Sequence, residues 1–355
     1  MDQILSDIAK RVFRSKENEI GKGLMHGSAG LSLFFYLIGE KSGDKSYQEE
    51  AERLLDHVFS NIQSASSTDI ENGLSGIGLA IELLIQNNFV EGDPDEVLEE
   101  IDNKVFKYLN EENINSFDLT NGLTGYLFYL ISRLKVRKPP VSMAYEINRE
   151  LLILVINRIY EQVTPQFPGL VKEMQFDLFW RFPVMLYGLS EAFRLEIYNR
   201  KIECMHRQWL PNFEAYIPSM HINRLYLAIL LQKISSQVPD ERLDRQINIL
   251  LYATNFNMIL NEIDPKQINL RFGWPGMILI LDIARSILKP EMPNYQLIEK
   301  CLNRIWDERK DILGSIDTTD FISKSKSLGI SEGIAGLGLF LLYLEVGIKN
   351  LNKCL

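Results

Sequence analysis

An internal repeat constrains the fold of this chain more than any other feature of the sequence. The repeat has one residue before Gly-x-x-Gly and an apolar residue after it, and it recurs along the 355 residues. Its copies occupy residues 26–31, 72–77, 121–126, 272–277 and 332–337. One Gly-x-x-Gly is weak evidence, but several copies, each placed directly before an apolar run, indicate a chain built from repeated units.

Each copy of the repeat opens an apolar run of helical length. The runs cover residues 31–38, 77–85, 126–134, 277–287 and 337–344. They are hydrophobic on nearly all sides, which is typical of helices that are buried all round. We expect the first glycine to support an unusual backbone turn at the helix entrance and the second to permit close packing.

Amphipathic segments with charged faces lie between these runs and predict an outer layer of helices. They cover residues 4–13, 47–61, 94–109, 141–160, 243–252 and 295–311. The two long gaps between motifs must hold degenerate copies, which we place at residues 182–189 and 224–231. Strand signals are almost absent. The pattern predicts an all-α chain with about seven outer and seven inner helices, arranged as a closed ring of helical hairpins.

Composition favours one soluble globular domain over residues 1–355. The chain is 46% hydrophobic and 24% charged, and no Pro/Gly/Ser-rich linker divides it. It has no apolar signal core at its start and no stretch near the roughly 20 apolar residues of a membrane span. Its three cysteines are widely spaced, so we expect a reducing, cytoplasmic compartment. A net charge of −9 argues against nucleic acid as a partner.

The chain resembles the LanC family of lanthionine synthetase cyclases over its whole length. The most specific segments are Arg271 to Met277 and Ser331 to Leu337, which look like the family's Trp-Cys-Tyr-Gly-x-Pro-Gly and Cys-His-Gly-x-x-Gly motifs. The resemblance implies an α/α toroid with the motif loops at one end. It also implies a zinc ion that delivers a peptide cysteine thiolate to a dehydrated serine or threonine, closing a thioether ring.

The chain departs from the family at the zinc ligands. Arg271, Ser331 and Glu332 stand where the family has two cysteines and a histidine, and such a set cannot hold zinc. The family's fourth-motif histidine aligns with Trp180, in a stretch without histidine. We therefore expect neither a metal nor another cofactor.

The residues around each first glycine share one structural position, at the mouth of the predicted ring. We expect a polar and aromatic floor there that contacts a peptide. Its predicted members are Glu71, Asn72, Asn121, Trp180, Arg181, Phe272, Trp274 and Ser331.

Three residues at the same mouth are candidates for catalysis. His26 or Glu332 could act as a general base toward a thiol, and Arg271 could stabilise the enolate that forms during addition. Arg271 and Glu332 are also predicted to form an ion pair where the metal would sit. The alternative for His26 is a structural role in capping or loop packing.

Two other features invite a metal or surface interpretation. His57 belongs to an outer amphipathic helix, so we expect it at the surface. Cys204 and His206 are two residues apart, and on a helix this separation points their side chains away from each other. We do not expect them to form a metal site.

Three functions of different classes then compete. The first is a LanC-like protein of a ribosomal-peptide pathway that binds a modified precursor peptide in the toroid cavity, and zinc-independent thioether cyclisation is a reaction open to it. The second is a non-catalytic scaffold, or pseudo-cyclase, for partner enzymes such as a dehydratase, and the loss of the zinc ligands and of the fourth-motif histidine favours it somewhat. The sequence leaves open whether the chain is an enzyme. The third is a glycoside hydrolase of the six-hairpin type, which would need Glu71 and Glu332 as its paired carboxylates. These two residues come from repeats that are not neighbours, so the third function is the weakest.

Overall fold

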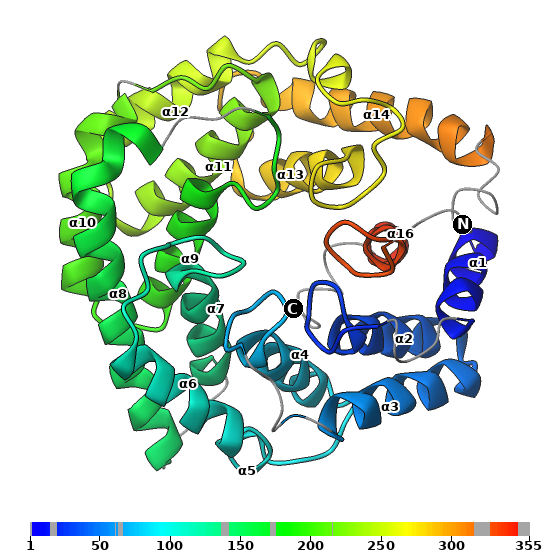
Figure 1. The fold of residues 1–355 in the computed structure, drawn as a ribbon. Helices are drawn as coiled ribbons and strands as arrows, with labels where there is room; N and C mark the ends of the chain where they lie inside the picture. Colours follow the sequence, from blue (N-terminus) through cyan, green and yellow to red (C-terminus); the bar gives the residue numbers. More distant parts are fainter. Residues whose placement is uncertain are drawn as a thin grey trace. The chain divides into compact units, whose positions relative to one another are not determined.

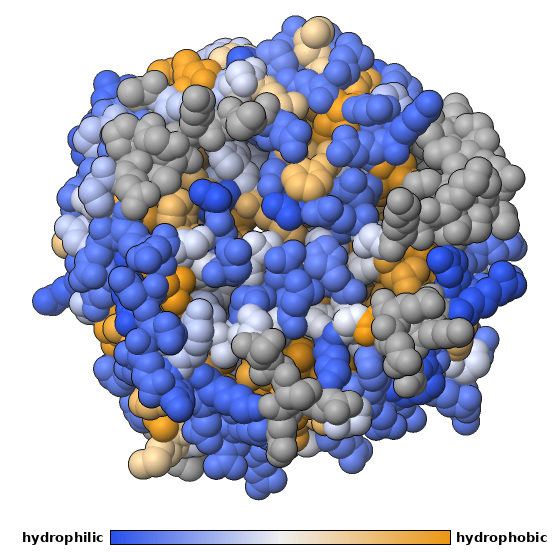
Figure 2. Space-filling model, in the orientation of Figure 1, coloured by the Kyte–Doolittle hydropathy of each residue, from blue (hydrophilic) through white to orange (hydrophobic). Residues whose placement is uncertain are grey.

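The computed structural model describes residues 2–14, 20–60, 62, 67–135, 142–170, 175–214, 216–315 and 327–346. Over these residues the regular structure is helical, apart from an isolated bridge between Gly21 and Gly27. None of the helices in these ranges combines the length and apolar character needed to cross a bilayer. On the face drawn in Figure 2, hydrophilic residues predominate and apolar residues form small separate groups.

The chain divides into two compact units. Unit 1 comprises Met1–Val155 and Ile316–Leu355, and unit 2 comprises Ile156–Ser315. The single domain expected over residues 1–355 stays a prediction.

Unit 1 contains a row of buried helices with amphipathic helices packed against it (Figure 1). Its buried helices contact one another in the order α16, α2, α4 and α7, while α1 packs on α16, α3 on α2 and α6 on α4. The bounds are α1 (Asp2–Phe13), α2 (Ser28–Ser42), α3 (Lys45–Phe59), α4 (Leu74–Gln86), α5 (Pro94–Val97), α6 (Glu99–Glu111), α7 (Leu123–Leu134) and α16 (Ile334–Val346). Helix α8 (Met143–Leu170) begins in this unit and continues into the next.

Unit 2 repeats this arrangement around α11, which contacts both α9 and α13. Helix α10 packs against α9 and α12, α12 against α11, and α14 against α13. The bounds are α9 (Arg181–Arg194), α10 (Asn199–Glu214), α11 (His221–Gln237), α12 (Glu241–Ala253), the 3₁₀ helix η3 (Ile259–Asn261), α13 (Trp274–Ile287) and α14 (Tyr295–Ser315). The degenerate copies predicted at residues 182–189 and 224–231 lie inside α9 and α11.

The loops that enter the buried helices cap them with backbone carbonyls. Leu74 N donates to Ser67 O at 3.1 Å, and Leu123 N donates to Ser116 O at 2.9 Å. The same seven-residue offset recurs at α2, α13 and α16. The first N–H groups of a helix have no partner within it, so the loop carbonyls take the place of a capping side chain, which is absent from α2, α4, α7 and α13.

The first glycine of the motif does not adopt the unusual turn that we expected. Gly73 has a φ of −101° and Gly122 a φ of −123°, which is extended backbone open to any residue. Glycine is required for space, because a Cβ on Gly73 would lie 2.5 Å from Asp69 N and one on Gly122 would lie 2.4 Å from Asp118 N. The expectation was wrong because the loop folds back tightly beneath the helix start.

The second glycine allows close packing, as predicted, but its partner is the entering loop. A Cβ on Gly76 would lie 2.1 Å from Ile70 O, and one on Gly276 would lie 2.2 Å from Leu270 O. Because both glycines of the motif lack a side chain, the first turn of the helix can pack directly against the loop that enters it. This fixes the backbone of the residues between them.

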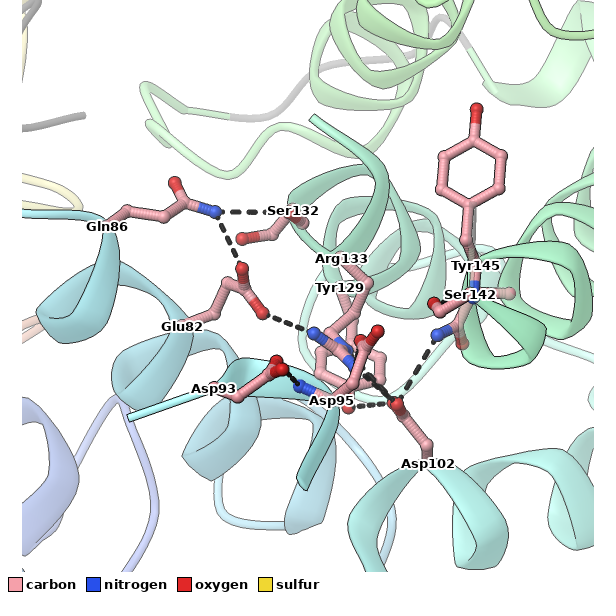
Figure 3. Close-up of polar contacts among 11 residues, drawn as sticks. Glu82, Gln86, Asp93, Asp95, Asp102, Tyr129, Ser132, Arg133, Ser142 and Tyr145 are labelled. Carbon is pink, nitrogen blue, oxygen red and sulfur yellow. Dashed lines mark hydrogen bonds and ion pairs between the residues drawn. The ribbon is translucent and has the colours of Figure 1, made fainter. Parts of the chain in front are cut away.

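A buried ion cluster joins helices α4, α5, α6 and α7 of unit 1 (Figure 3). The Arg133 side chain is 0% exposed, and its guanidinium lies 2.6 Å from Glu82, 2.7 Å from Asp102 and 2.9 Å from Asp95. Tyr129 donates its hydroxyl to Asp102 at 2.5 Å. Burial and the Asp102 charge hold the pKa of Tyr129 well above its usual value. The cluster lies within the apolar helix layer and ties α7 to its neighbours.

Candidate functional site

Backbone hydrogen bonds join the motif loops of unit 1 into one continuous series. Ile330 N donates to Met25 O at 2.8 Å, and Met25 N donates to Glu71 O at 2.9 Å. Glu71 N in turn donates to Thr120 O at 3.2 Å. The residues just before the first glycine of these four copies therefore lie on adjacent loops, as their shared position predicted.

A histidine and a carboxylate meet at the centre of this series. His26 Nε2 lies 3.0 Å from Glu71 Oε1, and the two side chains are 33% and 28% exposed. Their loops are in direct backbone contact, because a Cβ on Gly23 would lie 2.3 Å from Asn72 Cα. A carboxylate in this position orients an imidazole ring. The pair can therefore accept a proton from a bound group while remaining open to solvent.

The loop of the last copy packs directly on the loop of His26. A Cβ on Gly329 would lie 2.7 Å from His26 Cα. Ser331 is 2% exposed, and its hydroxyl oxygen is buried without a hydrogen-bond partner in the described part of the chain. The next residue, Glu332, is exposed. Two of the three predicted catalytic residues, His26 and Glu332, thus stand on neighbouring loops of one unit.

Polar side chains within the loops stabilise the loop conformation through hydrogen bonds. Ser116 Oγ donates to Asp118 Oδ2 at 2.9 Å, and Asp69 Oδ1 accepts from Asn72 N at 2.8 Å. Asn72 and Asn121 are exposed next to their first glycines. The Gly-x-x-Gly motif did not include these serine and aspartate residues. A serine six residues and an aspartate four residues before both Gly73 and Gly122 was the sequence signal that could have identified them.

In unit 2, Arg271 is held between a carboxylate and two aromatic rings. Its Nε and Nη2 atoms each lie 3.0 Å from an oxygen of Asp177. Its guanidinium carbon lies 4.6 Å from the ring centre of Phe272 and 5.2 Å from that of Phe179. Leu178 N donates to Arg271 O at 2.8 Å, which joins the degenerate copy to the motif loop.

Asp177 is the residue of this cluster that sequence reasoning missed. It lies in the aromatic segment that contains Phe179 and Trp180, and its charge there was the available signal. The predicted partner of Arg271, Glu332, belongs to unit 1, and that ion pair stays a prediction.

The remaining aromatic and basic candidates of unit 2 differ in exposure. Trp180 is 8% exposed and packs edge-on to Tyr226, with ring centres 6.2 Å apart. The Tyr226 hydroxyl donates to Leu178 O at 2.9 Å. Trp274 is fully buried, which supports a packing role, whereas Arg181 is exposed and accessible to a ligand.

The other histidines and the cysteine lie outside this site. His57 lies on α3 and is partly exposed, and its Nδ1 lies 2.9 Å from Ser28 Oγ. Cys204 is exposed while His206 is 3% exposed, so the two side chains point apart as predicted. Over the described ranges, histidine, cysteine, aspartate and glutamate nowhere gather in threes that could hold a metal ion.

Comparisons with known proteins agree with the motifs. The family model of the lanthionine synthetase C-like protein matches residues 19–170. The solved structure of a nisin cyclase matches with a TM-score of 0.69 and 15% sequence identity, covering 99% of this chain and 95% of that chain. No curated protein matches the chain by sequence. The structural likeness shows the fold, and the predicted all-α class, an α/α toroid, is confirmed.

Proposed function

We propose that this chain, whose residues 19–170 match the lanthionine synthetase C-like model and whose fold is similar to that of a nisin cyclase, binds a dehydrated precursor peptide of the lanthipeptide type and closes thioether rings in it without zinc. The observation that carries this proposal is the contact between His26 and Glu71. In this proposal His26 is the base at the motif loops, and the Glu71 carboxylate orients its ring. A base of this kind can replace a metal in activating a thiol.

The reaction is an addition in which every atom is conserved. His26 takes the proton of a peptide cysteine, and the thiolate sulfur bonds to the β-carbon of a dehydrated serine or threonine. The electron pair of the carbon–carbon double bond moves onto the neighbouring carbonyl as an enolate. The imidazolium then returns its proton to the α-carbon, and Glu71 stabilises the positive ring between the two transfers.

The residues at the family's zinc positions do not fit that metal. Zinc in proteins is held by thiolates, imidazoles and carboxylates. The three positions here hold Arg271, Ser331 and Glu332. Arg271 is paired with Asp177, and the Ser331 hydroxyl is buried. No step of the reaction is therefore assigned to a metal.

The exposed residues around the pair supply contacts to a peptide. The Asn72 and Asn121 amides can donate to and accept from a peptide backbone. Glu332, exposed on the loop that packs against His26, is the second candidate base. The glycosidase alternative gains no support, because Glu71 and Glu332 stand on loops that flank the His26 loop and are not neighbours of each other.

A thiol-protection assay tests the proposal. A synthetic peptide with one dehydroalanine and one cysteine is incubated with the protein and then treated with iodoacetamide, which adds mass only to free thiols. We expect the unalkylated fraction to grow with time and with protein concentration. A peptide that binds but stays fully alkylated would replace the cyclase proposal with the scaffold alternative. A peptide that does not bind would overturn both.

A further inference from the structure

A groove of about 420 Å³ lies in unit 2, between the end of α12 and the helix α14. Its volume falls within the roughly 300–1,000 Å³ of typical ligand sites. None of the residues that line it belongs to the motif loops. The proposed reaction at those loops therefore does not account for it.

Apolar side chains form the floor and walls of this groove. Phe256 and Cys301 are 5% and 4% exposed, and the Cys301 thiol donates to Phe256 O at 3.4 Å. Tyr252 and Leu297, which also line the groove, are 72% and 39% exposed. Large apolar side chains left exposed around a concavity mark sites of interaction. The walls can hold one large apolar side chain of a ligand.

The charged residues that line the groove are both cations. Lys300 is exposed, and Arg304 is fixed by Asn257, whose carbonyl and side-chain oxygens lie 3.1 and 3.2 Å from the guanidinium. The nearest carboxylate paired with Arg304 is Glu308 at 4.0 Å, outside the lining. In a chain of net charge −9, this local positive charge favours an acidic ligand.

The groove opens at the same end of unit 2 as the motif loop. The residues that follow α12 meet the start of α11, where Asn255 N donates to His221 Nδ1 at 3.1 Å. Five residues further along α11, the Tyr226 hydroxyl donates to Leu178 O, and Leu178 N donates to Arg271 O. A chain of direct contacts thus links the groove to Arg271. One extended peptide could occupy both places.

We propose that this groove docks an acidic segment of the same peptide that the motif loops act on. The inference rests on the proposed function. The segment places one large apolar side chain between Tyr252 and Leu297 and its carboxylates near Lys300 and Arg304. Anchoring by this segment raises the effective concentration of the reacting segment at the motif loops. A concave groove with cations in its wall suits a peptide better than a flat membrane surface.

Fluorescence anisotropy with a labelled anchor peptide tests the docking step alone. The probe is a short peptide of glutamate and leucine with one phenylalanine, and it lacks serine, threonine and cysteine. We expect saturable binding that weakens with salt. Lys300→Glu should weaken it about fivefold or more. Lys289→Glu makes the same charge change just beyond the far end of α13 and should leave binding unchanged. Equal effects of the two variants, or no binding of the probe to the wild type, would overturn the proposal that this groove docks an acidic segment.

A second arm separates this inference from the proposed function. The anchor is joined to a peptide that carries dehydroalanine and cysteine, and its binding is compared with that of each part alone. We expect the joined peptide to bind tighter than either part and to lose that advantage in Lys300→Glu. A joined peptide that binds no tighter than its parts would overturn the proposal that one peptide occupies both the groove and the motif loops. Failure of the proposed function would appear instead as no binding of the reactive part to the wild type.

Discussion

Glu71 Oε1 lies 3.0 Å from His26 Nε2, so a carboxylate from the second motif copy orients the imidazole of the first. A backbone hydrogen bond also joins the same loops, in which Met25 N donates to Glu71 O at 2.9 Å. The glycines that flank these residues allow the loops to pack closely against the helix starts. The pair is thus built on a fixed base, which a catalytic group requires.

Replacing His26 should remove most of the ring-closing activity. We expect His26→Asn to lower the rate of thiol protection by about 10²-fold or more, because general-base catalysis typically contributes that much. Glu71→Gln keeps the size of the side chain but removes its charge, and should give a smaller loss. Glu49→Gln, at an exposed position of α3, is the control for loss of a carboxylate. A wild-type rate in His26→Asn would exclude this histidine as the base.

Adding one methyl group to the second motif glycine should destabilise unit 1. In Gly76→Ala the new Cβ would meet the Ile70 carbonyl at 2.1 Å, so we expect a loss of about 1–3 kcal/mol. Gly39→Ala is the matched control, because its Cβ would lie 3.3 Å or more from its nearest neighbours, which belong to Tyr47 and Gln48 of α3. Urea unfolding of both variants measures the difference. Similar stabilities would show that the loop yields without penalty.

Breaking the buried ion cluster should destabilise the protein far more than breaking a surface pair. Arg133→Met leaves Glu82 and Asp102 buried without their cation, and removal of one partner from such a pair costs about 3–5 kcal/mol. Arg149→Met removes an exposed arginine whose pairs with Glu146 and Glu150 are worth at most about 1 kcal/mol. Chemical denaturation compares the two variants. Equal losses would contradict the structural role of Arg133.

Buried His206 should make the protein sensitive to acid. Burial lowers the pKa of His206 to about 4, and neither ring nitrogen has a hydrogen-bond partner in the described part of the chain. The unfolded histidine, with a pKa near 6.5, binds more protons between these values, so stability falls as pH drops from about 6.5 to 4. The loss from this residue is on the order of 3 kcal/mol.

His206→Leu tests this prediction against the carboxylates that also titrate in that range. The free energy of unfolding is measured in urea at several pH values for both proteins. We expect the variant to lose less stability than the wild type between pH 6.5 and 4. Parallel curves for the two proteins would show that His206 does not carry the effect.

The buried helices could be predicted from the sequence because their apolar runs are local. The five motif copies marked their starts to within a few residues, and even the degenerate α9 and α11 fell where the gaps required. The buried charges of this layer could not be predicted. Arg133 and Glu82 sit inside apolar runs of two different copies, and only packing of α4 against α7 brings them together.

The site was predicted in part, for a similar reason. His26 and Glu71 were both placed at the mouth, but their mutual contact depends on backbone bonds between loops 45 residues apart. Asp177 was missed as the partner of Arg271, because the pair is separated by 94 residues. The role of the first glycine was misjudged, since a sequence shows that glycine is needed but not whether conformation or space requires it.

We propose that this chain closes thioether rings without zinc. The most direct test is the rate of thiol protection after exhaustive dialysis against a chelator, with the metal content of the same sample measured by elemental analysis. We expect an unchanged rate in a metal-free protein and no gain when zinc is restored. A rate that disappears with the metal and returns with one equivalent of zinc would contradict it.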